Sequence, residues 1–110
     1  MAASPGTLPQ GTLELLILKT LAGAPCHGYA IARSIEEVTD DALRIEEGSL
    51  YPALYRMQRR GWIAAEWARS GLGKDIKLYA LTAKGRAQLR ARTAQWAHLI
   101  DAVAKVLRTS

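Results

Sequence analysis

The sequence is poor in cysteine and has no long apolar run, and each shortage excludes a class of protein. Cys26 is the only cysteine, so the chain cannot form an intrachain disulfide and lacks the framework of a small secreted scaffold. The start, MAASPGTLPQ, has neither the basic residues nor the apolar stretch of a signal peptide. The later run LELLILKTLAGA is too short and too interrupted by charge to cross a bilayer. We therefore expect a cytoplasmic protein without a membrane segment.

Motifs for catalysis and for metal binding are also missing. The sequence contains no nucleophile elbow, no glycine-rich phosphate loop and no carboxylates paired on an inward face, so we do not expect an enzyme. Cys26 and His27 are adjacent, but His98 is the only other histidine, and a metal site needs three or four ligands. We expect no metal or cofactor. Cys26 is either a redox-sensing thiol or a small buried residue between the first two helices.

Acidic residues are scarce in one part of the chain, and this scarcity points to a polyanionic partner. The 110 residues are enough for one domain, and the apolar share of 49% is that of a globular protein. Residues 1–53 hold three basic and seven acidic side chains, a net charge of −4. Residues 54–95 hold ten basic side chains against Glu66 and Asp75, a net charge of +8. Segregated positive charge of this kind is typical of proteins that bind nucleic acid.

The residue pattern predicts helices separated by one β-hairpin. An almost wholly apolar helix covers 10–22, an amphipathic helix covers 28–38, and LRIEE at 43–47 is expected to form one short strand. In the third helix, within GSLYPALYRMQRRGWI, Leu50, Ala53, Leu54 and Met57 have the spacing of a buried face. There Ser49 is the expected N-cap, which places Pro52 at the third helical position, and Gly61 ends the helix.

Two alternating segments, WIAAEWAR and IKLYAL, flank the turn-rich loop SGLGKD and predict an antiparallel hairpin. Thr82 caps a last helix that reaches Leu107. The fold class is therefore mostly α with a small antiparallel β-hairpin, namely a winged helix-turn-helix followed by a long C-terminal dimerisation helix. We assign 1–9 to a disordered N-terminal arm, 10–82 to the winged-helix DNA-binding domain and 83–110 to the dimerisation helix. The arm either stays floppy or orders against DNA or a partner subunit.

The last helix has a narrow apolar seam that needs a cover. The simplest cover is the same helix of a second copy, related by two-fold symmetry. Trp96 on this seam either pairs with its symmetry mate beside a planar aromatic ligand or is the largest packing residue of the interface. Trp62 and Trp67 are expected to pack against the long helix. The seam residues are Leu89, Trp96, Leu99, Ile100, Val103 and Leu107.

Burying the leucines of the third helix should turn a set of polar and aromatic side chains outward together. Arginine can pair with guanine edges or phosphates, and tyrosine can bind phosphates or pack on thymine methyl groups. In the hairpin loop, basic side chains would lie against the minor-groove backbone, unless the loop is only a solvated hairpin tip. The expected DNA-binding residues are Ser49, Tyr51, Pro52, Tyr55, Arg56 and Arg59 of the helix, with Arg69, Lys74 and Lys77 of the hairpin.

The segments ILKTLAGAPCHGYAI, GSLYPALYRMQRRGWI and LYALTAKG, in this order, resemble the PadR-like transcriptional regulators, and specifically their short members. The resemblance covers about Gly11 to Leu107. It implies a homodimeric DNA-binding repressor that recognises a dyad-symmetric operator. Members of the family are commonly released from DNA by small planar aromatic compounds, although many have no known ligand, so a ligand-blind repressor is the alternative. Where many members carry a basic pair before the tyrosine of the last strand, this chain has the sequence KDIKLYAL. We therefore expect its hairpin to bind DNA phosphates more weakly. The competing hypothesis is a winged-helix protein-interaction module without specific DNA binding.

Overall fold

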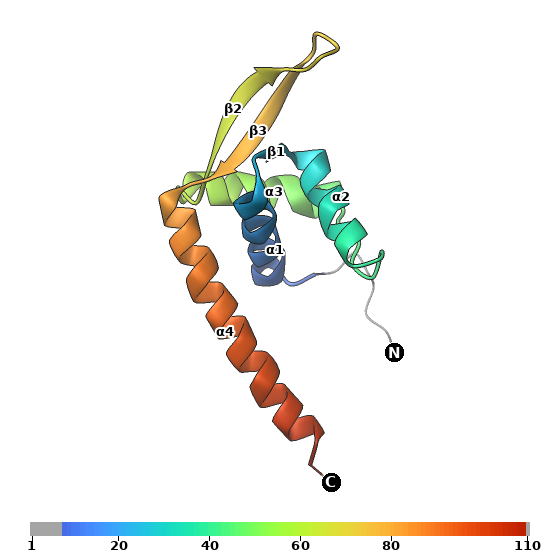
Figure 1. Cartoon of the computed structure of the whole chain (residues 1–110), viewed down its shortest axis with the longest axis vertical. Coiled ribbons are helices and arrows are strands. Elements are labelled where there is room, and N and C mark those ends of the chain that lie inside the picture. The colour runs from blue at the N-terminus through green and yellow to red at the C-terminus, as the bar shows by residue number, and fades with distance from the viewer. Residues whose placement is uncertain (1–7, 110) are drawn as a thin grey trace.

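The computed structural model describes residues 8–109, and over this range the chain forms four helices and a three-stranded antiparallel sheet (Figure 1). The predicted arm at 1–9 lies mostly outside the described residues. The strand order in the sheet is β1-β3-β2. The elements are α1 (Gln10–Gly23), β1 (Cys26–His27), α2 (Gly28–Val38), α3 (Glu47–Arg59), β2 (Ile63–Arg69), β3 (Asp75–Leu81) and α4 (Ala83–Leu107).

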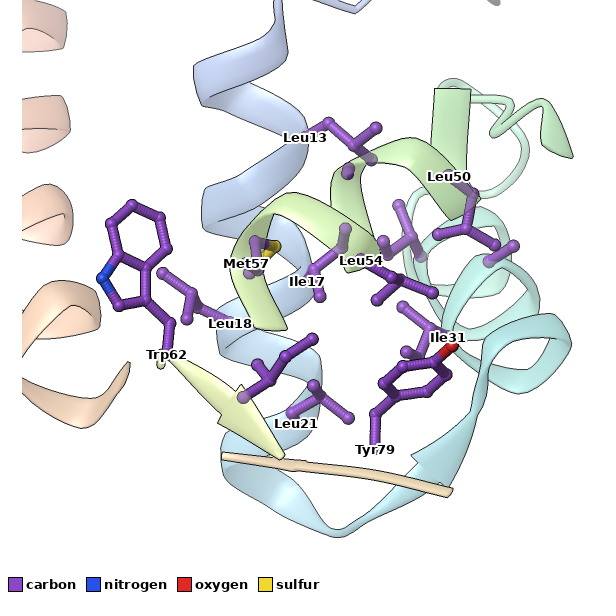
Figure 2. Close-up of a cluster of buried hydrophobic side chains, with 14 residues drawn as sticks. Leu13, Ile17, Leu18, Leu21, Ile31, Leu50, Leu54, Met57, Trp62 and Tyr79 are labelled. Atoms are coloured by element: carbon purple, nitrogen blue, oxygen red, sulfur yellow. The ribbon is translucent and has the colours of Figure 1, made fainter. Parts of the chain in front are cut away.

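The helix α1 forms the centre of the molecule, because it contacts the three other helices and β3. Its nearly continuous apolar surface explains this position: Ile17 and Leu18 are completely buried. Figure 2 shows these side chains meeting Leu54 and Met57 of α3 in one cluster. Each such side chain stabilises the fold by about 1.5–3 kcal/mol through burial. The predicted inner face of the third helix is thereby confirmed.

The start of α3 differs from the prediction. The N–H groups of Ser49 and Leu50 both donate to the carbonyl of Glu46, at 3.0 and 2.9 Å, so Glu46 is the N-cap and Glu47 is the first helical residue. Ser49 is therefore the third residue of the helix and not its cap. Pro52 consequently lies at the sixth position, beyond the free N–H groups of the first turn, and the carbonyl of Gly48 loses its usual i+4 donor.

The short strand expected at 43–47 is wrong. Side chains at the end of α2 take the backbone donors that a strand would use for pairing. The N–H of Leu43 donates to Oγ1 of Thr39 at 3.2 Å, and the N–H of Ile45 donates to Oε2 of Glu36 at 2.9 Å. These local bonds hold the segment as an irregular connection between α2 and α3.

The predicted end of α3 is confirmed. Gly61 has a φ of +78°, which L side chains rarely adopt. Its N–H donates to the carbonyl of Gln58 at 3.0 Å, and the N–H of Trp62 donates to the carbonyl of Met57 at 3.0 Å. This is the Schellman pattern, and it turns the chain directly from α3 into β2.

The strands β2 and β3 form the predicted hairpin, in a register that pairs Ala65 with Tyr79 and Trp67 with Lys77. Buried Tyr79 is the main contribution of β3 to the core, whereas the apolar residues Ile76 and Leu78 lie on the opposite face of the strand. The third strand, β1, was not predicted. Its two residues are too few to show any alternation, and only their pairing with β3 identifies them as a strand.

The first turns of α4 pack on the domain, and the rest of the helix projects away from it (Figure 1). Thr82 caps the helix as predicted, since its Oγ1 accepts from the N–H of Gly85 at 3.0 Å. Gly85 allows the close approach, because a Cβ there would lie 2.0 Å from the carbonyl oxygen of Trp62. Trp62 is buried beside α4, as Figure 2 shows. Trp67 does not pack against α4 and is 69% exposed, which corrects that expectation.

Candidate nucleic-acid interface

The outer face of α3 carries Pro52, Tyr55 and Arg59, all exposed to solvent. These residues are three, four and seven positions apart, so they share one side of the helix, opposite the buried leucines. The ring of Tyr55 is 61% exposed, and the guanidinium of Arg59 lies 5.8 Å from its centroid. This face thus presents a phenol and a cation together, in the arrangement that base edges and phosphates can use.

Tyr51 lies at the edge of this face, against the beginning of α2. A Cβ added to Gly28 would lie 2.8 Å from Cε1 of Tyr51, so the glycine leaves room for the ring. Burial raises the pKa of the Tyr51 hydroxyl, and the negative charge of Glu47 raises it further. Like an ordinary tyrosine hydroxyl, it is protonated at neutral pH and can donate a hydrogen bond to a phosphate oxygen.

The structure places Arg56 differently from the other predicted residues of α3. Its side chain is 34% exposed and turns toward α1, where its Nε lies 3.8 Å from Oε2 of Glu14. Arg60 and Arg92 approach the same carboxylate. The sequence did not predict this ion pair, because Glu14 lies on another helix, 42 positions earlier. Ser49 is exposed and lines a shallow cavity with Pro52 and Arg56.

The hairpin has its predicted basic residues, but they are not equivalent. Arg69 and Lys74 are exposed near the tip, where Gly73 adopts a φ of +79°. Asp75 is the direct cross-strand partner of Arg69, so opposite charges face each other there. Lys77 is half-buried nearer the base, with Nζ 5.6 Å from the centroid of Tyr79. The charge available at the tip is consequently small.

A cavity of about 460 Å³ separates the hairpin from the starts of α2 and α3, and the sequence pattern does not predict it. Three exposed aromatic side chains, Tyr29, Tyr51 and Trp67, line it, and their separation along the chain gave no sign in the sequence that they would meet. The cavity lies between the exposed face of α3 and the hairpin. Its other lining residues include Ile76, Lys77 and Tyr79.

The predicted seam of α4 is divided between two environments. Leu89 packs against the core of its own chain, whereas Leu99, Ile100 and Val103 are about half exposed and Leu107 is exposed. Trp96 is 42% exposed and lines a cavity of about 290 Å³ between α1 and α4, with Leu15, Arg92 and Leu99 among its other residues. The exposed part of this seam therefore forms an apolar stripe that continues from the cavity along the projecting part of the helix.

Neither Cys26 nor His27 forms part of a cluster of metal ligands among residues 8–109. His27 has a structural use, because its Nδ1 accepts from the N–H of Ala30 at 3.2 Å and so caps α2. Cys26 is partly buried in β1, and burial raises the pKa of its thiol. Over the same range, no helix is both long and apolar enough to cross a membrane.

Residues 17–91 match the transcriptional regulator PadR-like family. A PadR-family transcriptional regulator from Eggerthella lenta is similar in structure, with a TM-score of 0.78 and 39% identity over 92% of this chain and 86% of that chain. A PadR-like regulator from Bacillus cereus is similar with a TM-score of 0.79 and 30% identity, over 92% and 96% of the two chains. An uncharacterized protein X from Lysinibacillus sphaericus is 27% identical over 94 residues, which is 86% of each chain.

Proposed function

Because the chain belongs to the PadR-like family of transcriptional regulators, we propose that it is a homodimeric repressor of a dyad-symmetric operator, released by a small planar aromatic compound. Members of this family regulate transcription and are not enzymes. The winged-helix fold with an exposed third helix is that of a DNA-binding regulator. The exposed face of α3 carries the proposal, since the buried leucines leave Tyr55 and Arg59 free in solvent.

In the proposed complex, α3 enters the major groove with Pro52, Tyr55 and Arg59 toward the bases. Arg59 is the guanidinium best placed for a guanine edge, whereas Arg56 is held by Glu14. The hydroxyl of Tyr51 would donate a hydrogen bond to a phosphate of the DNA strand that passes between α3 and the hairpin. Arg69, Lys74 and Lys77 would add electrostatic contacts without sequence preference, reduced by the neighbouring Asp75.

A second copy of the chain is the proposed cover for the exposed stripe of α4. The 25 residues of α4 give a helix about 37 Å long. Its C-terminal part therefore extends well beyond the domain on which its first turns pack. Half-exposed Ile100 and Val103 would meet their symmetry mates in an isologous contact. Such a dimer would place two α3 helices in successive major grooves, about 34–36 Å apart.

The cavity beside Trp96 is the proposed effector site. It is continuous with the stripe of α4, so a planar compound stacked on the indole would contact both the domain and the proposed dimer interface. Its binding would favour one angle between the two subunits over another, and so change the spacing of the reading helices. Trp96 as a simple packing residue of the interface is the alternative role.

Duplex DNA selected by the wild-type protein from a random-sequence pool tests the proposal. Binding of the selected duplex and of a scrambled duplex is measured at two salt concentrations. We expect the selected duplex to bind at least 1000-fold more tightly than the scrambled one, and both affinities to fall steeply with salt. Failure to enrich any sequence, with little salt dependence, would instead favour the protein-interaction module.

A further inference from the structure

Glu14 is a buried carboxylate on α1, and three guanidinium groups from outside this helix approach it. Its side chain is 3% exposed. Oε1 lies 3.3 Å from Nη1 of Arg92 on α4, while Oε2 lies 3.8 Å from Nε of Arg56 and 3.6 Å from Nη1 of Arg60. Arg56 lies in the last turn of α3, and Arg60 follows directly after this helix. One side chain of α1 thus contacts both the proposed reading helix and the long helix.

The three ion pairs with Glu14 differ in distance and in hydrogen bonding. A buried carboxylate is strongly destabilising unless cations and hydrogen bonds compensate its desolvation. Arg92 compensates best, since its Nη1 donates to Glu14 and its Nε donates to Gln88 at 3.2 Å. Oε2 of Glu14 and Nε of Arg56 have no hydrogen-bond partner among the described residues. The attachment of α3 to Glu14 is therefore looser than the attachment of α4.

Trp62 gives two of the three guanidinium groups a second partner. The guanidinium carbon of Arg60 lies 5.1 Å from the centroid of its ring, and that of Arg92 lies 4.6 Å from it. Such cation–π contacts persist when the carboxylate is neutralised. No corresponding aromatic contact is found for Arg56 within the described part of the chain. Arg56 is consequently the cation that loss of the Glu14 charge would free.

We propose that Glu14 is a positioning residue for DNA binding, which sets the orientation of α3 against α4 and holds Arg56 away from DNA phosphates. The inference rests on the proposed role of α3 as the reading helix. Arg92 also lines the cavity beside Trp96, so a compound in that cavity would contact a guanidinium bound to the same carboxylate. Glu14 therefore lies between the proposed effector site and the proposed DNA interface.

The test is Glu14→Gln in the full chain, with the selected and scrambled duplexes described above. We expect the affinity ratio of selected to scrambled duplex to fall at least tenfold, because the end of α3 loses the ion pairs of Arg56 and Arg60 that refine its orientation beyond what core packing sets. The salt slope for the scrambled duplex should steepen by about 0.9, since one freed guanidinium reaches one more phosphate. The control is Glu37→Gln, which neutralises a carboxylate in an exposed pair with Arg33, and it should change neither quantity.

A purely structural role for Glu14 predicts another result. Both affinities would then fall by the same factor, in step with the folded fraction, and the salt slope would stay unchanged; this outcome overturns the proposal. Should Glu14→Gln fail to fold, Arg92→Gln replaces it, because it leaves Glu14 paired with Arg56 and Arg60. Arg92→Gln should lower the same affinity ratio severalfold, and an unchanged ratio contradicts the proposal.

Amide hydrogen exchange separates this inference from the proposed function. If the wild-type protein enriches no duplex, the DNA-binding proposal fails, but the positioning of α3 can still be measured. Glu14→Gln should then raise exchange at residues 53–60 severalfold more than at residues 30–37 of α2. Equal changes in the two helices would show that Glu14 does not position α3, whatever the protein binds.

Discussion

The ring of Tyr51 packs so closely on Gly28 that a methyl group there would lie 2.8 Å from Cε1. This contact joins the start of α2 to the edge of the proposed DNA-binding face. Gly28→Ala should therefore displace the Tyr51 ring and weaken binding of the selected duplex by about tenfold, the loss expected for one phosphate contact of roughly 1–1.5 kcal/mol. The displacement can be followed by the NMR resonances of the tyrosine ring. Unchanged resonances together with unchanged affinity would show that the contact is unimportant.

Gly85 tests the junction between the winged-helix domain and α4. A Cβ at this position would lie 2.0 Å from the carbonyl oxygen of Trp62, which is backbone and cannot rotate away. Gly85→Ala should therefore lower the free energy of unfolding by about 3 kcal/mol, measured by urea titration. Gly48→Ala is the matched control, because no atom of residues 8–109 lies within 4 Å of a Cβ there, and it should cause no loss. Equal stability of the two variants would contradict the described junction.

The proposed dimer depends on the exposed stripe of α4. Val103→Glu places a charge in the middle of the proposed contact, so the protein should sediment as a monomer and lose cooperative binding to the selected duplex. Its far-ultraviolet circular dichroism should stay unchanged, since Val103 does not contribute to the core of its own chain. Asp101→Asn, at an exposed pair with Lys105, is the control and should remain a dimer. A wild-type monomer at micromolar concentration would refute the proposed interface.

The reactivity of Cys26 follows from its environment. Because burial raises the pKa of the thiol, less thiolate is present at pH 8 than for a free cysteine. Alkylation by iodoacetamide should accordingly be several-fold slower in the folded protein than in 6 M guanidinium chloride. The rate should still rise with pH above 9, as the thiol ionises. Equal rates in the two states at pH 8 would contradict the protection of the thiol by burial and favour a redox-sensing thiol over a buried packing residue.

The parts of the fold that the sequence predicted are those coded by local pattern. The spacing of Leu50, Leu54 and Met57 identified the inner face of α3, and the left-handed position of Gly61 ended the helix. The start of α3 was misplaced, because Ser49 is a good capping residue and nothing local shows that the chain already turns at Glu46. The strand β1 exists only through its pairing with β3, which a two-residue segment cannot indicate.

The candidate site shows the same division between local and long-range information. Helical spacing predicted the outward direction of Tyr55 and Arg59, and the structure bears this out. It could not predict that Arg56 turns to Glu14, because that contact depends on how α1 and α3 cross. Trp67 was expected to pack against α4, but the hairpin carries it away from that helix to the cavity between the hairpin and the starts of α2 and α3. Packing between elements, rather than pattern within them, decided both cases.

The most direct test of the proposed DNA-binding face is the affinity of Arg59→Ala for the selected duplex. Arg59 is exposed, and within the described residues it forms no ion pair, so its removal should leave the fold and the oligomeric state intact. We expect the selected duplex to bind at least tenfold more weakly, and the scrambled duplex to be affected much less, as loss of a bidentate base contact of about 1–3 kcal/mol requires. Arg108→Ala, on the distal end of α4, is the control. If Arg59→Ala binds the selected duplex as tightly as the wild type, the outer face of α3 does not read DNA.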